Sequence, residues 1–235
     1  MAILIFLLGM ITGSILNFCI YTIPRYDGPN KWYDSLSFLN ILFCRKLRYC
    51  NYNIFFRNLI VELLTGIIFV LLFNKFKWSM DFIVYTFLST LLVIIAIIDI
   101  DYQIISDNLV ILIFLIAIIY EITNNHLINL LNNIIALILS GLLFTIIFIV
   151  SKGGIGGGDI KLIGVLGFIL GIPKIFLSIF LSFLLGAVAS IVLLSCGIRN
   201  RRDVIPFGPF MVLSFLITSI WGEEIIHWYI YKLLT

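Results

Sequence analysis

The chain of 235 residues is 62% hydrophobic and only 11% charged, and its mean hydropathy is +1.19. A soluble domain carries about 25% charged residues, so these charges are too few to cover a water-exposed surface, which excludes a soluble enzyme. The formal net charge of +3 comes without a basic run interleaved with aromatic residues, which argues against nucleic acid as a partner.

Hydropathy predicts an all-α membrane protein, a polytopic bundle of about eight transmembrane helices, since each span needs about 20 apolar residues. The opening run has no Lys or Arg before it and no Ala-x-Ala-like end, so we expect a retained span rather than a cleaved signal peptide. In chain order, the expected spans are 2–23, 58–73, 81–98, 108–123, 129–150, 159–172, 174–197 and 205–221.

One sizeable polar segment, 24–57, follows the first span and predicts a small cytoplasmic loop domain. We therefore divide the chain into 1–73, the first two helices with this shortened domain, and 74–235, the remaining bundle. If the N-terminus lies outside, eleven of the 15 Lys and Arg residues fall in cytoplasmic segments. Because cytoplasmic loops carry an excess of Lys and Arg, we expect both chain ends to lie outside.

Two acidic residues at the ends of spans are candidates for chemistry, because acidic side chains at membrane depth are costly and usually functional. Asp99 ends the third expected span and Asp159 begins the sixth, so both face the cytoplasm at similar depth. Two carboxyl groups within a few ångströms cannot both ionise, so one stays protonated while the other activates water. Such a pair could hydrolyse a peptide bond without a metal or a covalent intermediate.

The helix ends suggest a role for each carboxyl group. Asp159 begins a helix, where the helix dipole favours the anion, whereas Asp99 ends one, where the dipole disfavours it. Our hypothesis is that Asp159 is the resting base and Asp99 the resting acid. The alternative is that Asp99, with Asp101 and Asp107, is simply a polar residue of a membrane-surface loop.

Several further residues are candidates for supporting roles. Three glycines before Asp159 would let a substrate backbone approach it closely: Gly156, Gly157 and Gly158. The same glycines would also suit a flexible loop or close helix packing. Lys161 could assist Asp159 electrostatically or extend to lipid headgroups, and Glu62 could be functional or satisfied by a hydrogen bond within its helix. His126 and His227 lie on the outer side and receive no role.

Short motifs occur in a fixed order along most of the chain. They are Gly13-Ser14-Ile15-Leu16-Asn17, Trp32-Tyr33-Asp34-Ser35, Val61-Glu62-Leu63-Leu64-Thr65-Gly66, Ile98-Asp99-Ile100-Asp101 with Ile105-Ser106-Asp107, Gly156-Gly157-Gly158-Asp159-Ile160-Lys161, and Ile205-Pro206-Phe207-Gly208-Pro209-Phe210. In this combination the sequence resembles the type IV prepilin peptidases, which are membrane aspartic proteases of the Gly-x-Gly-Asp type.

The resemblance implies an aspartic endopeptidase of the bacterial plasma membrane that cuts the leader from prepilins or pseudopilins at the cytoplasmic face. It implies Asp99 and Asp159 as the catalytic pair, 74–235 as the peptidase bundle, membrane lipid around it, and no cofactor for the peptidase reaction. Many members also methylate the new N-terminus through the cytoplasmic domain. S-adenosylmethionine is therefore expected here only if methylation is retained.

The cytoplasmic segment departs from the family's pattern. Members usually carry two Cys-x-x-Cys pairs there, whereas this chain keeps Cys44 and Cys50 without such a pair. Tetrahedral thiolate zinc needs four ligands, so we expect no metal, and methylation is less certain than cleavage. Ser106 also replaces the proline that usually precedes Asp107, which changes neither proposed catalytic residue.

Two other classes of protein fit part of the pattern. An ion-coupled transporter could use Asp99 and Asp159 as carriers, but such sites lie near the bilayer midplane, whereas span counting puts both residues at one face. A non-catalytic membrane scaffold would leave the acidic pair unexplained. Among proteases, a relative that trims the ends of other membrane proteins stays open.

Overall fold

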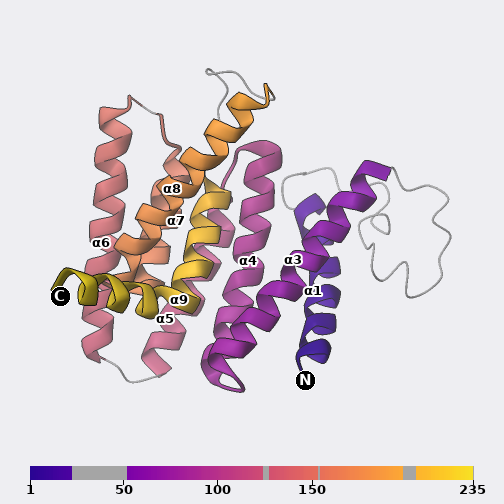
Figure 1. Ribbon diagram of the computed structural model, residues 1–235, viewed down its shortest axis with the longest axis horizontal. Coiled ribbons are helices and arrows are strands. Elements are labelled where there is room, and N and C mark those ends of the chain that lie inside the picture. Colours follow the sequence, from indigo (N-terminus) through magenta and orange to yellow (C-terminus); the bar gives the residue numbers. More distant parts are fainter. Residues whose placement is uncertain (23–51, 124–126, 153, 198–204, 235) are drawn as a thin grey trace. The chain divides into compact units, whose positions relative to one another are not determined.

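The computed structural model describes residues 1–22, 52–123, 127–152, 154–197 and 205–234 (Figure 1). Across these ranges the regular structure is helical, without strands, which confirms the all-α prediction. The helices are α1 (Ala2–Thr22), α3 (Tyr52–Phe76), α4 (Met80–Tyr102), α5 (Asp107–Thr123), α6 (Leu127–Val150), α7 (Gly157–Leu170), α8 (Lys174–Ser195) and α9 (Gly208–Leu234). Each expected span corresponds to one of these helices.

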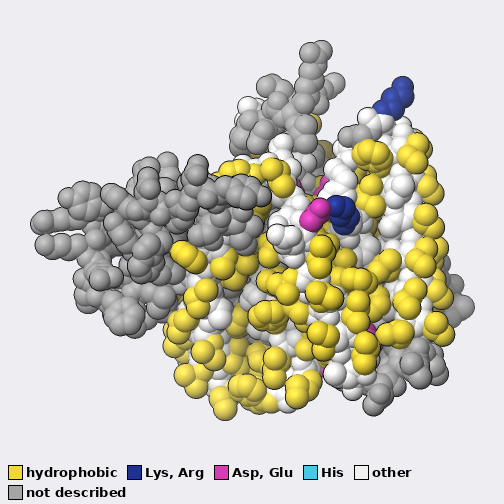
Figure 2. Space-filling model, turned by 180° about the vertical axis from the view of Figure 1, so that it is seen from behind, with side chains coloured by type: hydrophobic (Ala, Val, Ile, Leu, Met, Phe, Trp, Pro, Cys, Tyr) yellow, Lys and Arg dark blue, Asp and Glu magenta, His cyan; other side chains and the backbone are white. Residues whose placement is uncertain are grey.

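Six of the helices are long and apolar enough to cross a membrane, whereas α5 has 17 residues and α7 has 14. The chain is a multi-pass membrane protein. Figure 2 shows hydrophobic side chains over most of the described surface in that view, as expected of helices that face lipid.

Two helix boundaries differ most from the prediction. Helix α3 begins at Tyr52 rather than near 58, and α9 continues beyond 221 to Leu234. Hydropathy marks only the apolar part of a helix, whereas the backbone hydrogen bonds continue into the polar residues beyond it. Most of the predicted cytoplasmic segment, 24–51, lies outside the described residues.

The described helices form two compact units, Met1–Ile98 and Asp99–Thr235. The boundary falls in the last turn of α4, so Asp99 belongs to the second unit. The division of the chain at 73–74 that we drew from the sequence stays a prediction.

In the first unit, α1 and α3 pack closely because glycines stand at their contact. A Cβ added at Gly9 would lie 2.7 Å from the Cα of Gly66, and one added at Gly13 would lie 2.8 Å from the Cα of Glu62. The hydroxyl of Thr65 donates a hydrogen bond of 2.9 Å to the carbonyl of Gly9. The four-residue spacing of Gly9 and Gly13 is typical of closely packed membrane helices.

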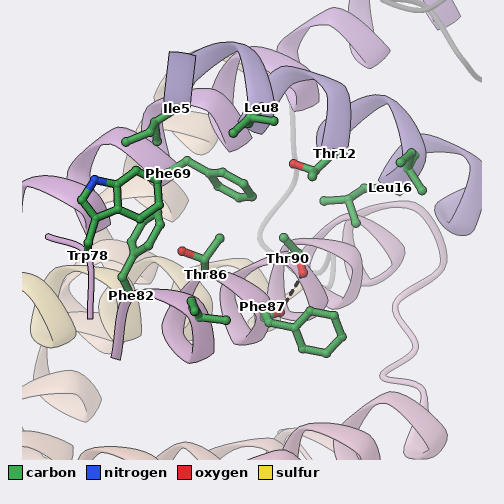
Figure 3. A pocket seen from close by; sticks show the side chains of 12 residues that line it. Ile5, Leu8, Thr12, Leu16, Phe69, Trp78, Phe82, Thr86, Phe87 and Thr90 are labelled. Carbon is green, nitrogen blue, oxygen red and sulfur yellow. Dashed lines mark hydrogen bonds between the residues drawn. The ribbon is translucent and has the colours of Figure 1, made fainter. Parts of the chain in front are cut away.

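A cavity of about 420 Å³ lies within the first unit, among side chains of α1, the end of α3 and α4 (Figure 3). Its walls are apolar apart from threonine hydroxyls, and they are formed by Ile5, Leu8, Thr12, Ile15, Leu16, Phe69, Trp78, Phe82, Ile83, Thr86, Phe87 and Thr90. None of these residues is charged, so the cavity lacks the acid and base that hydrolysis of a peptide bond needs.

The second unit is built around α7, the shortest of the described helices. It packs against α5, α6, α8 and α9, and most of its side chains are buried. Helix α6 approaches closely at Gly167, where an added Cβ would lie 2.8 Å from the carbonyl oxygen of Ala136. The Ser140 hydroxyl also donates a hydrogen bond of 3.2 Å to the carbonyl of Ile163. Packing on several sides lets so short a helix form, since tertiary contacts supply most of a helix's stability.

Candidate active site

Asp159 lies in the first turn of α7, directly after the glycine run. Its side chain is buried, with 8% of its surface exposed. The backbone N–H of Gly156, the residue that caps the helix, donates a hydrogen bond of 3.0 Å to Oδ2 of Asp159. A carboxylate at this end of a helix is stabilised by the helix dipole.

Asp99 lies in the last turn of α4 and is also buried, with 5% of its surface exposed. Its Oδ2 accepts a hydrogen bond of 2.8 Å from the backbone N–H of Gly208, the first residue of α9. A Cβ added at Gly208 would lie only 2.7 Å from that oxygen. Glycine at position 208 therefore lets the α9 backbone approach this carboxyl group without displacing it.

The two carboxyl groups lie close enough for their charges to repel one another. Three segments far apart in the sequence thus meet here: the end of α4, the start of α7 and the start of α9. All three belong to the second unit. Because the charges of the two buried carboxyl groups repel, a state in which one of them is protonated is favoured.

The position of Asp99 between two helix ends bears on which carboxyl group is the acid and which is the base. Asp99 ends α4, as expected, but it also faces the N-terminus of α9 through the N–H of Gly208. Both carboxyl groups therefore lie at a helix N-terminus, where an anion is favoured. The helix dipoles alone do not distinguish the two residues, and Asp159 as the resting base stays a hypothesis.

Lys161 and Asp107 form an ion pair between α7 and α5. The Lys161 Nζ donates to both carboxylate oxygens of Asp107, each at 2.8 Å. The two side chains are 57% and 56% exposed, respectively. Lys161 therefore has a protein partner, and it does not hydrogen-bond to Asp159.

The three glycines before Asp159 have different surroundings. A Cβ at Gly158 would lie 2.8 Å from the Cβ of Ile105, in the connection between α4 and α5. A Cβ at Gly157 would meet no atom within 4 Å, and Gly157 is exposed. Gly158 is thus needed for packing, whereas Gly157 leaves open space beside the site.

Two other predicted supporting residues are Asp101 and Glu62. Asp101 is exposed in the last turn of α4. Glu62 belongs to the first unit, where it is fully buried in α3 beside Gly13.

Gly208 is the residue that sequence reasoning missed. It appeared only as part of the motif that opens the last expected span. A glycine two residues after Pro206 and just before Pro209 was the available signal, but its contact with Asp99 depends on how α9 packs.

Within the ranges that the structure describes, no group of three or more His, Cys, Asp or Glu residues could hold a metal ion. Cys44 and Cys50, on which the zinc prediction depends, lie outside those ranges, as does most of the segment that the resemblance assigns to S-adenosylmethionine. The absence of a metal stays a prediction.

Comparison with known proteins identifies a family model and several relatives that match this chain. Residues 86–191, which include Asp99 and Asp159, match the model of the type IV leader peptidase family. A prepilin leader peptidase/N-methyltransferase of Bacillus subtilis (strain 168) is 29% identical over 84% of this chain and 79% of its own length. Proteins of the same name from Aeromonas salmonicida (strain A449) and Legionella pneumophila are 27% and 28% identical, over 90% and 88% of this chain and 74% of each relative. No solved structure matches.

Proposed function

We propose that this chain, whose residues 86–191 match the model of the type IV leader peptidase family, cuts the leader from prepilins or pseudopilins as an integral-membrane aspartic endopeptidase. The observation that carries the aspartic mechanism is the buried pair of Asp99 and Asp159, each held by one backbone N–H. No observation favours the transporter or the scaffold over this reading.

The two hydrogen bonds suggest that the two oxygens of each carboxyl group have different roles. Each bond engages Oδ2, which leaves Oδ1 of each group to carry the shared proton or to hold the attacking water. In the proposed step, the ionised carboxylate takes a proton from water as the water oxygen bonds to the scissile carbonyl carbon. The protonated group gives its proton to the carbonyl oxygen.

Collapse of the resulting tetrahedral intermediate completes the reaction. The C–N bond breaks, the leaving nitrogen takes a proton from the group that acted as base, and the other carboxyl group recovers its own proton from the hydroxyl. Atoms and charges balance without a metal, a cofactor or a covalent intermediate. Asp159 as the resting base and Asp99 as the resting acid stay a hypothesis, since both carboxyl groups accept an N–H at the start of a helix.

The proposed active site faces the cytoplasm, because the Lys and Arg bias puts the start of the sixth span on that side. Lys152 is exposed in the turn before the glycine run and offers a test. In a cysteine-free background, Lys152→Cys should react with a membrane-impermeant maleimide only after the cytoplasmic side is opened. Labelling of intact cells would instead put this end of α7 outside.

Methylation of the new N-terminus is a second proposed activity, supported by the names of the relatives. S-adenosylmethionine would supply the methyl group, and the peptidase step would proceed without it. The mass of the cleaved pilin, measured with and without S-adenosylmethionine, distinguishes a methylating enzyme from a peptidase alone.

The decisive experiment is cleavage of a coexpressed prepilin by the wild type, by Asp99→Asn and by Asp159→Asn. Asparagine keeps the size of the side chain but removes the ionisable proton, so both variants should be present in the membrane and should not cut. Asp81→Asn, at the opposite end of α4, is the matched control and should cut normally. Cleavage by either variant at the wild-type rate would show that its carboxyl group is structural.

A further inference from the structure

We infer that the ion pair between Asp107 and Lys161 is a positioning device for the carboxyl pair. It ties the first turns of α7, which carry Asp159, to the start of α5, which follows Asp99 through a short connection. This inference rests on the proposed function. It makes Asp107 and Lys161 positioning residues that act through the two carboxyl groups and do not touch the substrate.

The geometry of the pair is that of a two-point contact. The Lys161 Nζ lies 2.8 Å from both Oδ1 and Oδ2 of Asp107, so the ammonium group bridges the carboxylate. Asp107 is the first residue of α5, where the helix dipole favours its negative charge. Lys161 follows Asp159 by two residues, so a shift of Lys161 moves the same part of the helix that carries Asp159.

A second contact fastens the same two segments. Gly158 packs against Ile105 so closely that an added Cβ would lie 2.8 Å from the Cβ of Ile105. Gly158 directly precedes Asp159, and Ile105 lies two residues before Asp107. The start of α7 is therefore held on both sides of Asp159, by an apolar contact before it and by an ion pair after it.

The connection between α4 and α5, which contains Ile105, begins with a hydrogen bond to Asp99. The backbone N–H of Gln103 donates a hydrogen bond of 2.8 Å to the carbonyl of Asp99, and the N–H of Val110 donates one of 3.2 Å to the carbonyl of Ser106. These bonds close the end of α4 and the start of α5. A contact between this connection and α7 can therefore set where Asp159 stands relative to Asp99.

Because the ion pair between Asp107 and Lys161 is exposed, a role in positioning can be distinguished from a role in stability. Exposed ion pairs contribute little to folding, so loss of this pair should leave the amount of folded protein unchanged. A misplacement of reacting groups by about 1 Å, in contrast, can lower the rate by about 100-fold. A large effect on kcat without an effect on stability is thus the signature of a positioning pair.

The chain contains a matched control. Lys174 and Glu223 form an ion pair of the same length, 2.8 Å, between α8 and α9. Their side chains are 30% and 63% exposed, so this pair is also open to solvent, although Lys174 is less exposed than Lys161. It joins helices other than α4, α5 and α7, so its removal measures the effect of losing an interhelical ion pair as such.

The experiment compares Asp107→Asn, Lys161→Gln and the double variant, each purified in lipid and assayed with a prepilin that the wild type cuts. We expect each single change to lower kcat by roughly 10- to 100-fold with KM unchanged. The double variant should be no slower than the worse single one, because both changes remove the same contact. Lys161→Arg, which keeps a bridging cation, should restore most of the rate.

Several results would overturn the inference. If Lys161→Gln is slow but Asp107→Asn is normal, the charge of Lys161 acts on Asp159 by itself. A rise in KM alone would make the pair part of substrate binding, and an equal loss in Lys174→Gln would make the effect a general one. Normal rates in all pair variants, with Asp159→Asn still inactive, would refute the inference alone. If the wild type cuts no prepilin, both the proposed function and the inference are wrong.

Discussion

Each of the two units contains a glycine that faces a buried acidic residue, and the two contacts differ in what they touch. In the first unit, the space at Gly13 is filled by the hydroxyl of Thr65 and the Cα of Glu62, both on the facing helix. In the second unit, the space at Gly208 is filled by the carboxyl group of Asp99. The first contact brings two helices together, whereas the second sets the position of a reactive group.

The comparison shows that burial of an acid does not by itself identify a catalytic group. Glu62 is more deeply buried than Asp99 or Asp159. In the second unit, each of the two carboxyl groups accepts an N–H at the start of a helix, and their charges repel one another. Those two features, rather than burial, suit them to share a proton.

Substitution of Gly208 should have the largest effect of the changes that leave both acids intact. In Gly208→Ala, the new Cβ would fall 2.7 Å from Oδ2 of Asp99, so the carboxyl group or α9 must move. We expect kcat for leader cleavage to fall by about 100-fold with little change in KM.

Gly141→Ala is the control for that change, because an added Cβ there meets no atom within 4 Å. It should cut at a rate within about twofold of the wild type. If Gly208→Ala also cuts at that rate, the hydrogen bond from Gly208 does not position Asp99, and the distinction between the two glycines fails.

Alanine substitutions at Gly157 and Gly158 should distinguish a role of the glycine run in helix packing from a role in the approach of the substrate. Gly158→Ala forces its Cβ against Ile105 and should lower kcat by about tenfold, because the start of α7 shifts. Gly157→Ala meets no protein atom. If the open side of the glycine run admits the substrate backbone, this change should raise KM and leave kcat unaltered.

Steady-state cleavage of a purified prepilin by the two variants measures both quantities. Equal and normal KM values for Gly157→Ala and the wild type would mean that the substrate does not approach at this glycine. The role of the run would then be confined to Gly158 and its contact with Ile105.

Much of this arrangement could be predicted from the sequence, because membrane spans are read from hydropathy alone. All eight expected spans correspond to helices, and span counting put Asp99 and Asp159 at one face. The structure brings the two carboxyl groups together, while their catalytic roles stay a prediction. The resemblance to the leader peptidases used the same residues.

The rest depended on packing that hydropathy does not report. The contact of Gly208 with Asp99 joins residues 109 positions apart and exists only because α9 begins beside the end of α4. The end of α9 was placed too early because Glu223 and Glu224 resemble a polar boundary, although Glu223 pairs with Lys174 on α8 within a continuing helix. The sequence likewise did not indicate that Lys161 pairs with Asp107, since the two residues are 54 positions apart.

Substitution of Gly13 should have the smallest effect on activity and a clear effect on stability. In Gly13→Ala the added Cβ would fall 2.8 Å from the Cα of Glu62 and would overlap the hydroxyl of Thr65, so α1 and α3 must separate slightly. Overpacking of this kind costs about 1–3 kcal/mol. We expect a lower unfolding temperature in detergent, with kcat of the folded enzyme within about twofold of the wild type.

Gly141→Ala again serves as the reference, because its added methyl group meets open space. If Gly13→Ala loses cleavage as completely as Gly208→Ala while it remains folded, then the contact beside Glu62 also serves the reaction. Glu62 would in that case act with the carboxyl pair despite its place in the first unit. A loss of stability alone would keep the two glycines distinct: one permits two helices to pack, and the other permits a backbone N–H to reach a carboxyl group.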